Sequence, residues 1–176
     1  ACCGHTFAPI DGALALQAKL GVSADKIARL KISTYRSALE VALYEEPETA
    51  AEARFSLKYV VAAALTHGSV RLAAFEPDRL TNPATRALMQ RIELSVDPEI
   101  DELFPGARAA RIEMVTTDGR RGRHLQPTRK GDPDAPLTDR DLEDKYTELA
   151  APVLGPAKAA TLLARLWSIE RAASVS

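Results

Sequence analysis

The chain has 176 residues, of which 46% are apolar and 27% are charged, and its formal net charge is −1 at pH 7. These values indicate a folded globular protein with one or two small domains. A net charge so close to zero gives no support for binding to nucleic acid or to an anionic membrane. No apolar run is long enough to span a bilayer, and the first residues lack the basic start of a signal peptide. We therefore expect a cytoplasmic protein.

The first half of the chain combines helical and strand patterns. Residues 10–20 predict a helix, and Gly21 follows at the position where a left-handed residue commonly ends one. Residues 27–35 alternate between apolar and polar side chains, which predicts a half-buried strand. The segment from Pro47 to about Thr66 predicts the longest helix, and its second half is apolar on every side. Such a helix belongs in an interior.

The second half predicts an α+β fold class. A helix is expected over 82–90, strands over 92–96, 110–114 and 121–125, and a hairpin turn at Asp118-Gly119. A turn-rich loop over 129–136 precedes two helices, expected at about 138–150 and 157–172. We therefore predict a small antiparallel sheet with helices packed on one face, followed by a C-terminal helical pair. The expected domains are an α+β lobe over 1–137 and a helical unit over 138–176.

The sequence begins with Ala1-Cys2-Cys3-Gly4-His5, which permits several interpretations. Adjacent cysteines cannot easily bridge each other, so we expect reduced thiols. A closed zinc site needs four ligands with longer gaps between them than this segment offers. A cysteine near a helix N-terminus can act as a nucleophile, because the helix dipole stabilises the thiolate. The interpretation that the spacing favours is that both cysteines are small packing residues.

Two further clusters carry candidate chemistry. Arg54 and Lys58 stand at i and i+4 of the predicted long helix, a like-charge pair that an anion would relieve, and Tyr59 lies beside them. Tyr59 is either a proton donor near two cations or a core tyrosine. The arginines over 120–130 form a basic cluster without interleaved aromatic residues, which favours a solvated sheet edge over a nucleic-acid site.

Separated stretches of the chain resemble the MmgE/PrpD family in order and spacing. They are Ala1-Cys2-Cys3-Gly4-His5-Thr6 with Ile10-Asp11, then 52–62 with the sequence EARFSLKYVVA, then Lys130-Gly131-Asp132-Pro133 with Pro136-Leu137-Thr138. The family includes 2-methylcitrate dehydratase, cis-aconitate decarboxylase and an iminodisuccinate epimerase. The resemblance covers the C-terminal portion only of the family's members, which are more than twice as long.

The resemblance implies acid/base chemistry on di- or tricarboxylates, without a metal or an organic cofactor. The activity it implies most directly is that of a 2-methylcitrate dehydratase-like lyase. It places catalytic roles on Tyr59 and His5. Substrate binding is expected from Cys2, Cys3, Gly4 and Arg54.

The resemblance also implies partners. These are a small polycarboxylate substrate, an N-terminal helical domain on which the residues after 137 would pack, and a second copy in a homodimer; neither nucleic acid nor a membrane is expected. The family's upstream lysine, and the histidines and aspartate of its helical domain, do not occur in these 176 residues. We therefore expect the chain alone to be inactive. The alternative hypothesis is a catalytically incomplete fragment that serves as a folding or interaction module.

Overall fold

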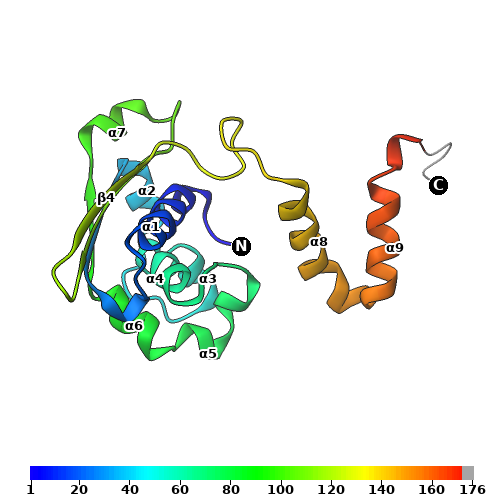
Figure 1. Cartoon of the computed structure of the whole chain (residues 1–176), viewed down its shortest axis with the longest axis horizontal. Coiled ribbons are helices and arrows are strands. Elements are labelled where there is room, and N and C mark those ends of the chain that lie inside the picture. The colour runs from blue at the N-terminus through cyan, green and yellow to red at the C-terminus, as the bar shows by residue number, and fades with distance from the viewer. Residues whose placement is uncertain (172–176) are drawn as a thin grey trace. The chain divides into compact units, whose positions relative to one another are not determined.

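The computed structural model describes residues 1–171. It divides the chain into two compact units, Ala1–Asp134 and Ala135–Ser176, which we describe separately. The first unit consists of a sheet and several helices, and the second is helical within its described residues (Figure 1). The predicted α+β fold class is confirmed. The predicted end of the last helix at residue 172 lies outside the described residues.

The first unit is built on a four-stranded sheet in the order β2-β1-β3-β4. Its strands are β1 (Ile27–Thr34), β2 (Ile92–Val96), β3 (Ala110–Thr116) and β4 (Arg121–Gln126). The pairs β1–β3 and β3–β4 are antiparallel, whereas β1 and β2 are parallel. The sheet is therefore mixed, and the prediction of an antiparallel sheet was wrong for one pair. The long helical connection from β1 to β2 allows this parallel pairing, which a short hairpin would forbid.

The hairpin between β3 and β4 forms where the sequence predicts it. Gly119 has φ of 85°, a left-handed conformation that glycine adopts without strain. β3 buries alternate residues against the helices, from Ala110 through Ile112 and Met114. β4 pairs on one side only and is an edge strand of the sheet, in agreement with the interpretation of its arginines as edge residues.

Helices cover one face of this sheet (Figure 1). α1 (Phe7–Leu20) lies directly against β3 and β4, and α4 (Leu57–His67) packs behind α1, with most of its side chains buried. Gly12 allows the close approach of α1, because a Cβ atom there would lie 2.9 Å from Ile112 Cγ1. The helices of this unit are η1 (Gly4–Thr6), α1 (Phe7–Leu20), η2 (Ala24–Lys26), α2 (Arg36–Val41), α3 (Ala50–Arg54), α4 (Leu57–His67), η3 (Leu72–Phe75), α5 (Pro77–Leu80), α6 (Pro83–Met89) and α7 (Pro98–Leu103).

The long helix predicted from Pro47 to Thr66 is two helices, α3 and α4. Thr49 caps α3, in a reciprocal capping box with Glu52. Ser56 then caps α4, because its hydroxyl oxygen accepts a hydrogen bond from the backbone N–H of Tyr59. The prediction of one continuous helix was therefore wrong, and the residues on either side of Ser56 do not share a helical face.

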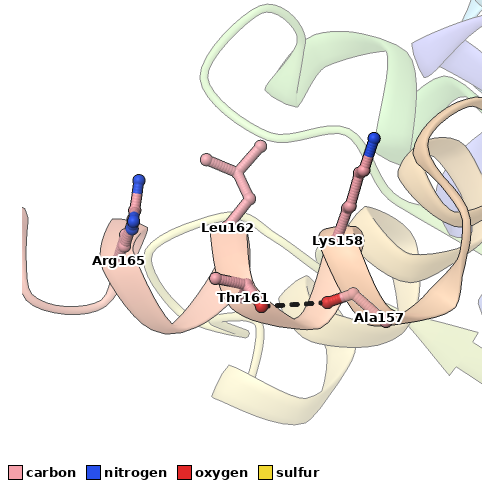
Figure 2. A pocket seen from close by; sticks show the side chains of 5 residues that line it. All are labelled: Ala157, Lys158, Thr161, Leu162 and Arg165. Carbon is pink, nitrogen blue, oxygen red and sulfur yellow. Dashed lines mark hydrogen bonds between the residues drawn. The ribbon is translucent and has the colours of Figure 1, made fainter.

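The second unit contains α8 (Asp139–Leu154), α9 (Pro156–Leu166) and η4 (Ile169–Arg171). The predicted capping box at the start of α8 is present, with Thr138 and Asp141 bonded reciprocally. The indole N–H of Trp167 donates to Glu143 Oε1 at 2.8 Å and thereby ties the end of α9 to α8. Figure 2 shows a surface pocket along α9, where the Thr161 hydroxyl donates to the carbonyl oxygen of Ala157. Within residues 1–171, every helix is too short or too polar to cross a membrane.

Candidate functional site

The N-terminal turn that carries the predicted site residues is fixed to the end of α3. The backbone N–H of Cys3 donates to the carbonyl oxygen of Arg54 at 3.0 Å. The carbonyl oxygen of Cys3 accepts bonds from the backbone N–H of Thr6 at 3.0 Å and from its hydroxyl at 2.7 Å. The structure therefore brings together Cys3 and Arg54, two residues predicted to bind substrate.

The thiol of Cys2 packs inside this turn. Its Sγ lies 3.4 Å from Thr6 Oγ1, and burial raises its pKa above the ordinary value. A raised pKa keeps the thiol protonated at neutral pH, which argues against a nucleophilic Cys2 and favours packing. Both cysteines are free thiols, as predicted. Among the described residues, no group of His, Cys, Asp and Glu side chains is placed to hold a metal ion.

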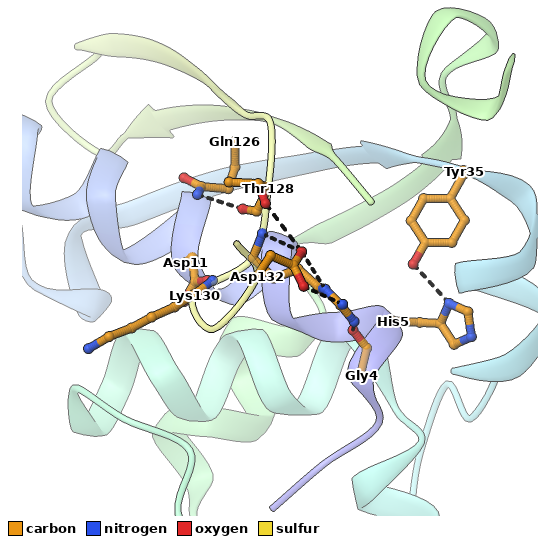
Figure 3. A network of polar contacts seen from close by, with 9 residues as sticks. Gly4, His5, Asp11, Tyr35, Gln126, Thr128, Lys130 and Asp132 are labelled. Atoms are coloured by element: carbon orange, nitrogen blue, oxygen red, sulfur yellow. Dashed lines mark hydrogen bonds and ion pairs between the residues drawn. The ribbon is translucent and has the colours of Figure 1, made fainter. Parts of the chain in front are cut away.

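His5 points at the hydroxyl of Tyr35. His5 Nδ1 lies 2.8 Å from Tyr35 Oη, and Figure 3 shows the phenol hydroxyl facing the imidazole. Tyr35 follows β1 directly, is fully buried, and stacks on Phe104 with the ring centroids 4.6 Å apart. The ring of His5 also lies 6.1 Å from that of Phe104. Stacking fixes the phenol, and the phenol in turn fixes the orientation of the imidazole.

The protonation states of this pair follow from their surroundings. Burial raises the pKa of Tyr35 to about 12, so the phenol stays neutral. Burial also lowers the pKa of His5, and the positive charges of Arg108 and Arg129 lower it further. A neutral imidazole is consequently present at neutral pH. If its Nδ1–H donates to the Tyr35 oxygen, Nε2 carries the lone pair that a general base needs.

The loop after β4 clamps the N-terminal turn from the other side (Figure 3). Arg129 forms a bidentate ion pair with Asp132, in which Nη2 donates to Oδ1 at 2.5 Å and Nε donates to Oδ2 at 3.0 Å. Its Nη1 donates to the carbonyl oxygen of Gly4 at 3.3 Å. The next residue, Lys130, donates its backbone N–H to Asp11 Oδ2 at 2.8 Å. Arg129 lowers the pKa of Asp132 to about 2, which keeps the pair charged at neutral pH.

A pocket of about 380 Å³ lies between this loop and the segment before β3. Its lining comes from residues 105–108 and from 127–129 with 132–134. Two of its walls continue into the segments that hold the His5–Tyr35 pair, since Pro105 follows the stacked Phe104 and Arg129 bonds to Gly4. The Nε of Arg108 is buried there and has no hydrogen-bond partner among the described residues.

Tyr59 and Arg54 lie in a different cluster. The Tyr59 side chain is fully buried, and its hydroxyl donates to the carbonyl oxygen of Ala74. The Arg54 guanidinium lies 5.1 Å above the ring of Phe75, which itself stands 6.2 Å from the ring of Tyr59. The structure therefore links Tyr59 with Arg54 through Phe75, and it places His5 with Tyr35 instead. The predicted role of Tyr59 in catalysis stays a prediction.

The predicted like-charge pair of Arg54 and Lys58 was wrong. The break at Ser56 puts them on different helices, and Lys58 forms an ion pair with Glu45. The sequence analysis also missed three residues of the site, Tyr35, Arg108 and Arg129. Tyr35 could have been found as an aromatic residue with a polar tip at the end of a buried strand. Arg108 gave no local signal. Arg129 was interpreted as part of the basic cluster of a solvated sheet edge, which was wrong for this residue, because its side chain is largely buried and pairs with Asp132.

The comparisons with known proteins agree with this architecture. The sequence profile of the MmgE/PrpD C-terminal domain matches residues 1–169. The chain is 31% identical over 133 residues to the cis-aconitate decarboxylase-like protein oryM of Aspergillus oryzae, a match that covers 75% of the chain and 27% of that protein. It is also 28% identical over 108 residues to mouse cis-aconitate decarboxylase and 29% identical over 108 residues to the human protein, covering 61% of the chain and 22% of each relative.

These matches span about a quarter of the length of each relative. The family profile, in contrast, covers the chain almost from end to end and includes both the N-terminal turn and the loop that clamps it. The chain therefore belongs to the MmgE/PrpD family, as the family's C-terminal domain.

Proposed function

We propose that the chain is the C-terminal part of a longer lyase that acts on a small tricarboxylate by acid/base chemistry, without a metal or an organic cofactor. The observation that carries the proposal is the hydrogen bond between His5 and Tyr35, which orients an imidazole whose pKa is lowered by burial and by the charges of Arg108 and Arg129. A neutral imidazole next to positive charge suits proton transfer at a carbon atom adjacent to a carboxylate. The C–H group of that carbon becomes more acidic when the neighbouring carboxylate is bound to a cation.

In this proposal His5 Nε2 exchanges a proton with the substrate carbon, while Tyr35 holds the ring through Nδ1. In a dehydration, His5 would remove the proton from carbon, and the adjacent hydroxyl would accept a proton from Tyr59 and leave as water. In a decarboxylation, Nε2 would first take up a proton from solvent, and the imidazolium would deliver that proton to carbon as the bond to CO2 breaks. The Cys2–Gly4 turn and Arg54 would contribute to the wall of the substrate site, and Tyr59 would donate or position a proton from a second side.

The relatives determine which substrates should be tried first. Three of them carry the name of cis-aconitate decarboxylase or of a protein like it, so we propose cis-aconitate as the first candidate. A 2-methylcitrate dehydratase-like activity, which the sequence resemblance implied, is the second. We also propose an N-terminal helical domain as the structural partner, a homodimer as the assembly and the cytoplasm as the location.

The test uses the complete polypeptide in which this chain occurs, with cis-aconitate and 2-methylcitrate as substrates. We expect turnover of at least one substrate. His5→Gln should lower kcat/KM by about 100-fold or more, the usual contribution of a positioned acid or base. Tyr35→Phe should lower it less, and Tyr44→Phe, an exposed tyrosine of the same unit, serves as the matched control. Full activity of His5→Gln would refute the role of His5.

The alternative, a module without catalysis, makes a different prediction about size. The chain has a mass of 19.0 kDa. A natural polypeptide of that mass that turns over neither substrate would favour the module. A polypeptide more than twice as large that is active would favour the enzyme.

A further inference from the structure

Arg108 carries a positive charge that no other described residue balances. Its Nε is buried, and the side chain forms no hydrogen bond or ion pair within residues 1–171. The side chain as a whole is half-buried, but a buried N–H without a partner loses its hydration and gains nothing in return. Such a group is expected to have a partner in the working protein. A planar guanidinium suits a carboxylate best, since it can donate two parallel hydrogen bonds.

The other charged residues around the pocket do not supply that partner. Asp132 is already bound by Arg129 through both of its oxygens. Asp134 also lines the pocket, but it is exposed and forms no hydrogen bond or ion pair with any described residue. Arg108 is therefore the cation in the lining that stays available for an anion from solution.

The position of Arg108 fits a role beside His5. It ends the pocket-lining segment that starts at Pro105, and Phe104, just before that segment, stacks on Tyr35. Burial is the main cause of the lowered pKa of His5, and the positive charge of Arg108 adds to it; the same charge opposes the larger effect of burial that raises the pKa of Tyr35. The pocket, with about 380 Å³, is within the size range of small-molecule sites.

We propose that Arg108 binds one carboxylate of the substrate and holds it in the pocket beside His5, which makes Arg108 a specificity-determining residue for molecules with several carboxylates. The substrate class in this inference rests on the proposed function; the anion site itself rests on Arg108 and the pocket. The bound carboxylate would neutralise the guanidinium, whose Nε is buried. It would also leave the adjacent carbon within reach of the imidazole.

The experiment measures binding and turnover separately, in the complete polypeptide. The binding probe is tricarballylate, a tricarboxylate with neither a hydroxyl nor a double bond, followed by titration calorimetry. Arg108→Gln should weaken binding by at least about tenfold, the effect of losing one charged hydrogen bond. Arg108→Lys should restore part of the affinity, because lysine keeps the positive charge but cannot donate two parallel hydrogen bonds. Asp134→Asn should bind as tightly as the parent or more tightly, and Arg123→Gln, an exposed arginine of β4, should not differ from it.

A labelling measurement on the unmodified sequence covers the case in which a variant fails to fold. Phenylglyoxal should modify Arg108 more slowly when tricarballylate is present, whereas Arg123 should react at the same rate with and without it. Parent-like binding by Arg108→Gln, or no protection of Arg108, would overturn the inference even if the polypeptide turns over its substrate. Arg108-dependent binding without turnover of either substrate would support the anion site and count against the proposed lyase.

Discussion

Replacing Gly12 by alanine tests whether α1 is held at a distance that only glycine allows. Gly12 is buried in the middle of α1, where a Cβ atom would lie 2.9 Å from Ile112 Cγ1 and 3.0 Å from Gln126 Cβ. Carbon atoms normally approach to about 3.5–4.0 Å. Ile112 is fully buried in β3 and cannot move aside easily. The helix would have to move away from the sheet.

The expected magnitude is the difference between two opposed effects. Alanine raises helix propensity by about 1 kcal/mol relative to glycine. Overpacking a close-packed core costs about 1–3 kcal/mol. Both close contacts involve atoms near the backbone rather than flexible tips, so the upper half of that range applies. We expect a net loss of about 1–2 kcal/mol in the free energy of unfolding.

The assay must report on the first unit alone, because Trp167 lies in the second. Hydrogen exchange of peptides from β3, followed along a urea titration, meets that need. Ala15→Gly is the matched control: Ala15 is exposed on the same helix, so its loss of about 1 kcal/mol measures propensity without packing. A Gly12→Ala protein as stable as the parent would refute the close approach of α1.

Three further predictions concern single side chains. Asp132→Asn should loosen the loop and speed amide exchange at Lys130. In the parent, the pKa of Asp132 is lowered to about 2, so the stability that its carboxylate supplies is present above about pH 4 and is lost as the pH falls toward 2. A pH titration of unfolding without this loss would contradict the ion pair. Tyr59→Phe should lower the free energy of unfolding by about 1–3 kcal/mol, because the Ala74 carbonyl loses its buried hydrogen-bond donor. A kcat/KM within about threefold of the parent would show that Tyr59 is not catalytic. Cys2 should react slowly with a disulfide reagent at pH 7, because its thiol is partly buried and its raised pKa keeps it protonated; labelling as fast as a free cysteine would refute that placement.

The sequence predicted the features that depend on local chemistry. Gly21 ends α1 in the left-handed conformation, with φ of 61°, and Gly119 forms the hairpin turn. Thr138 caps α8, although its partner in the capping box is an aspartate. Each of these depends on the conformational preferences of a few adjacent residues, which a sequence displays directly.

Features that depend on competition between distant parts of the chain could not be predicted. The break at Ser56 escaped notice because the apolar pattern continues on both sides of it, while only a tertiary bend makes its hydroxyl a cap. The parallel pairing of β1 with β2 could not be predicted, since the alternation of apolar and polar residues is the same in parallel and antiparallel strands. His5 was predicted as a site residue, whereas Tyr35 and Arg108 were not, because their approach to His5 follows from the fold.

The clamp on the N-terminal turn has a consequence for the order of folding. Arg129 reaches Gly4 across 125 residues of sequence, and Lys130 reaches Asp11 across 119. Contacts between such distant residues close large loops, and the packing of α1 against β3 and β4 closes the same loops. We therefore expect the clamp on the N-terminal turn to form late, so a ribosome must have released the whole hairpin of β3 and β4 and the loop after it before the clamp can assemble.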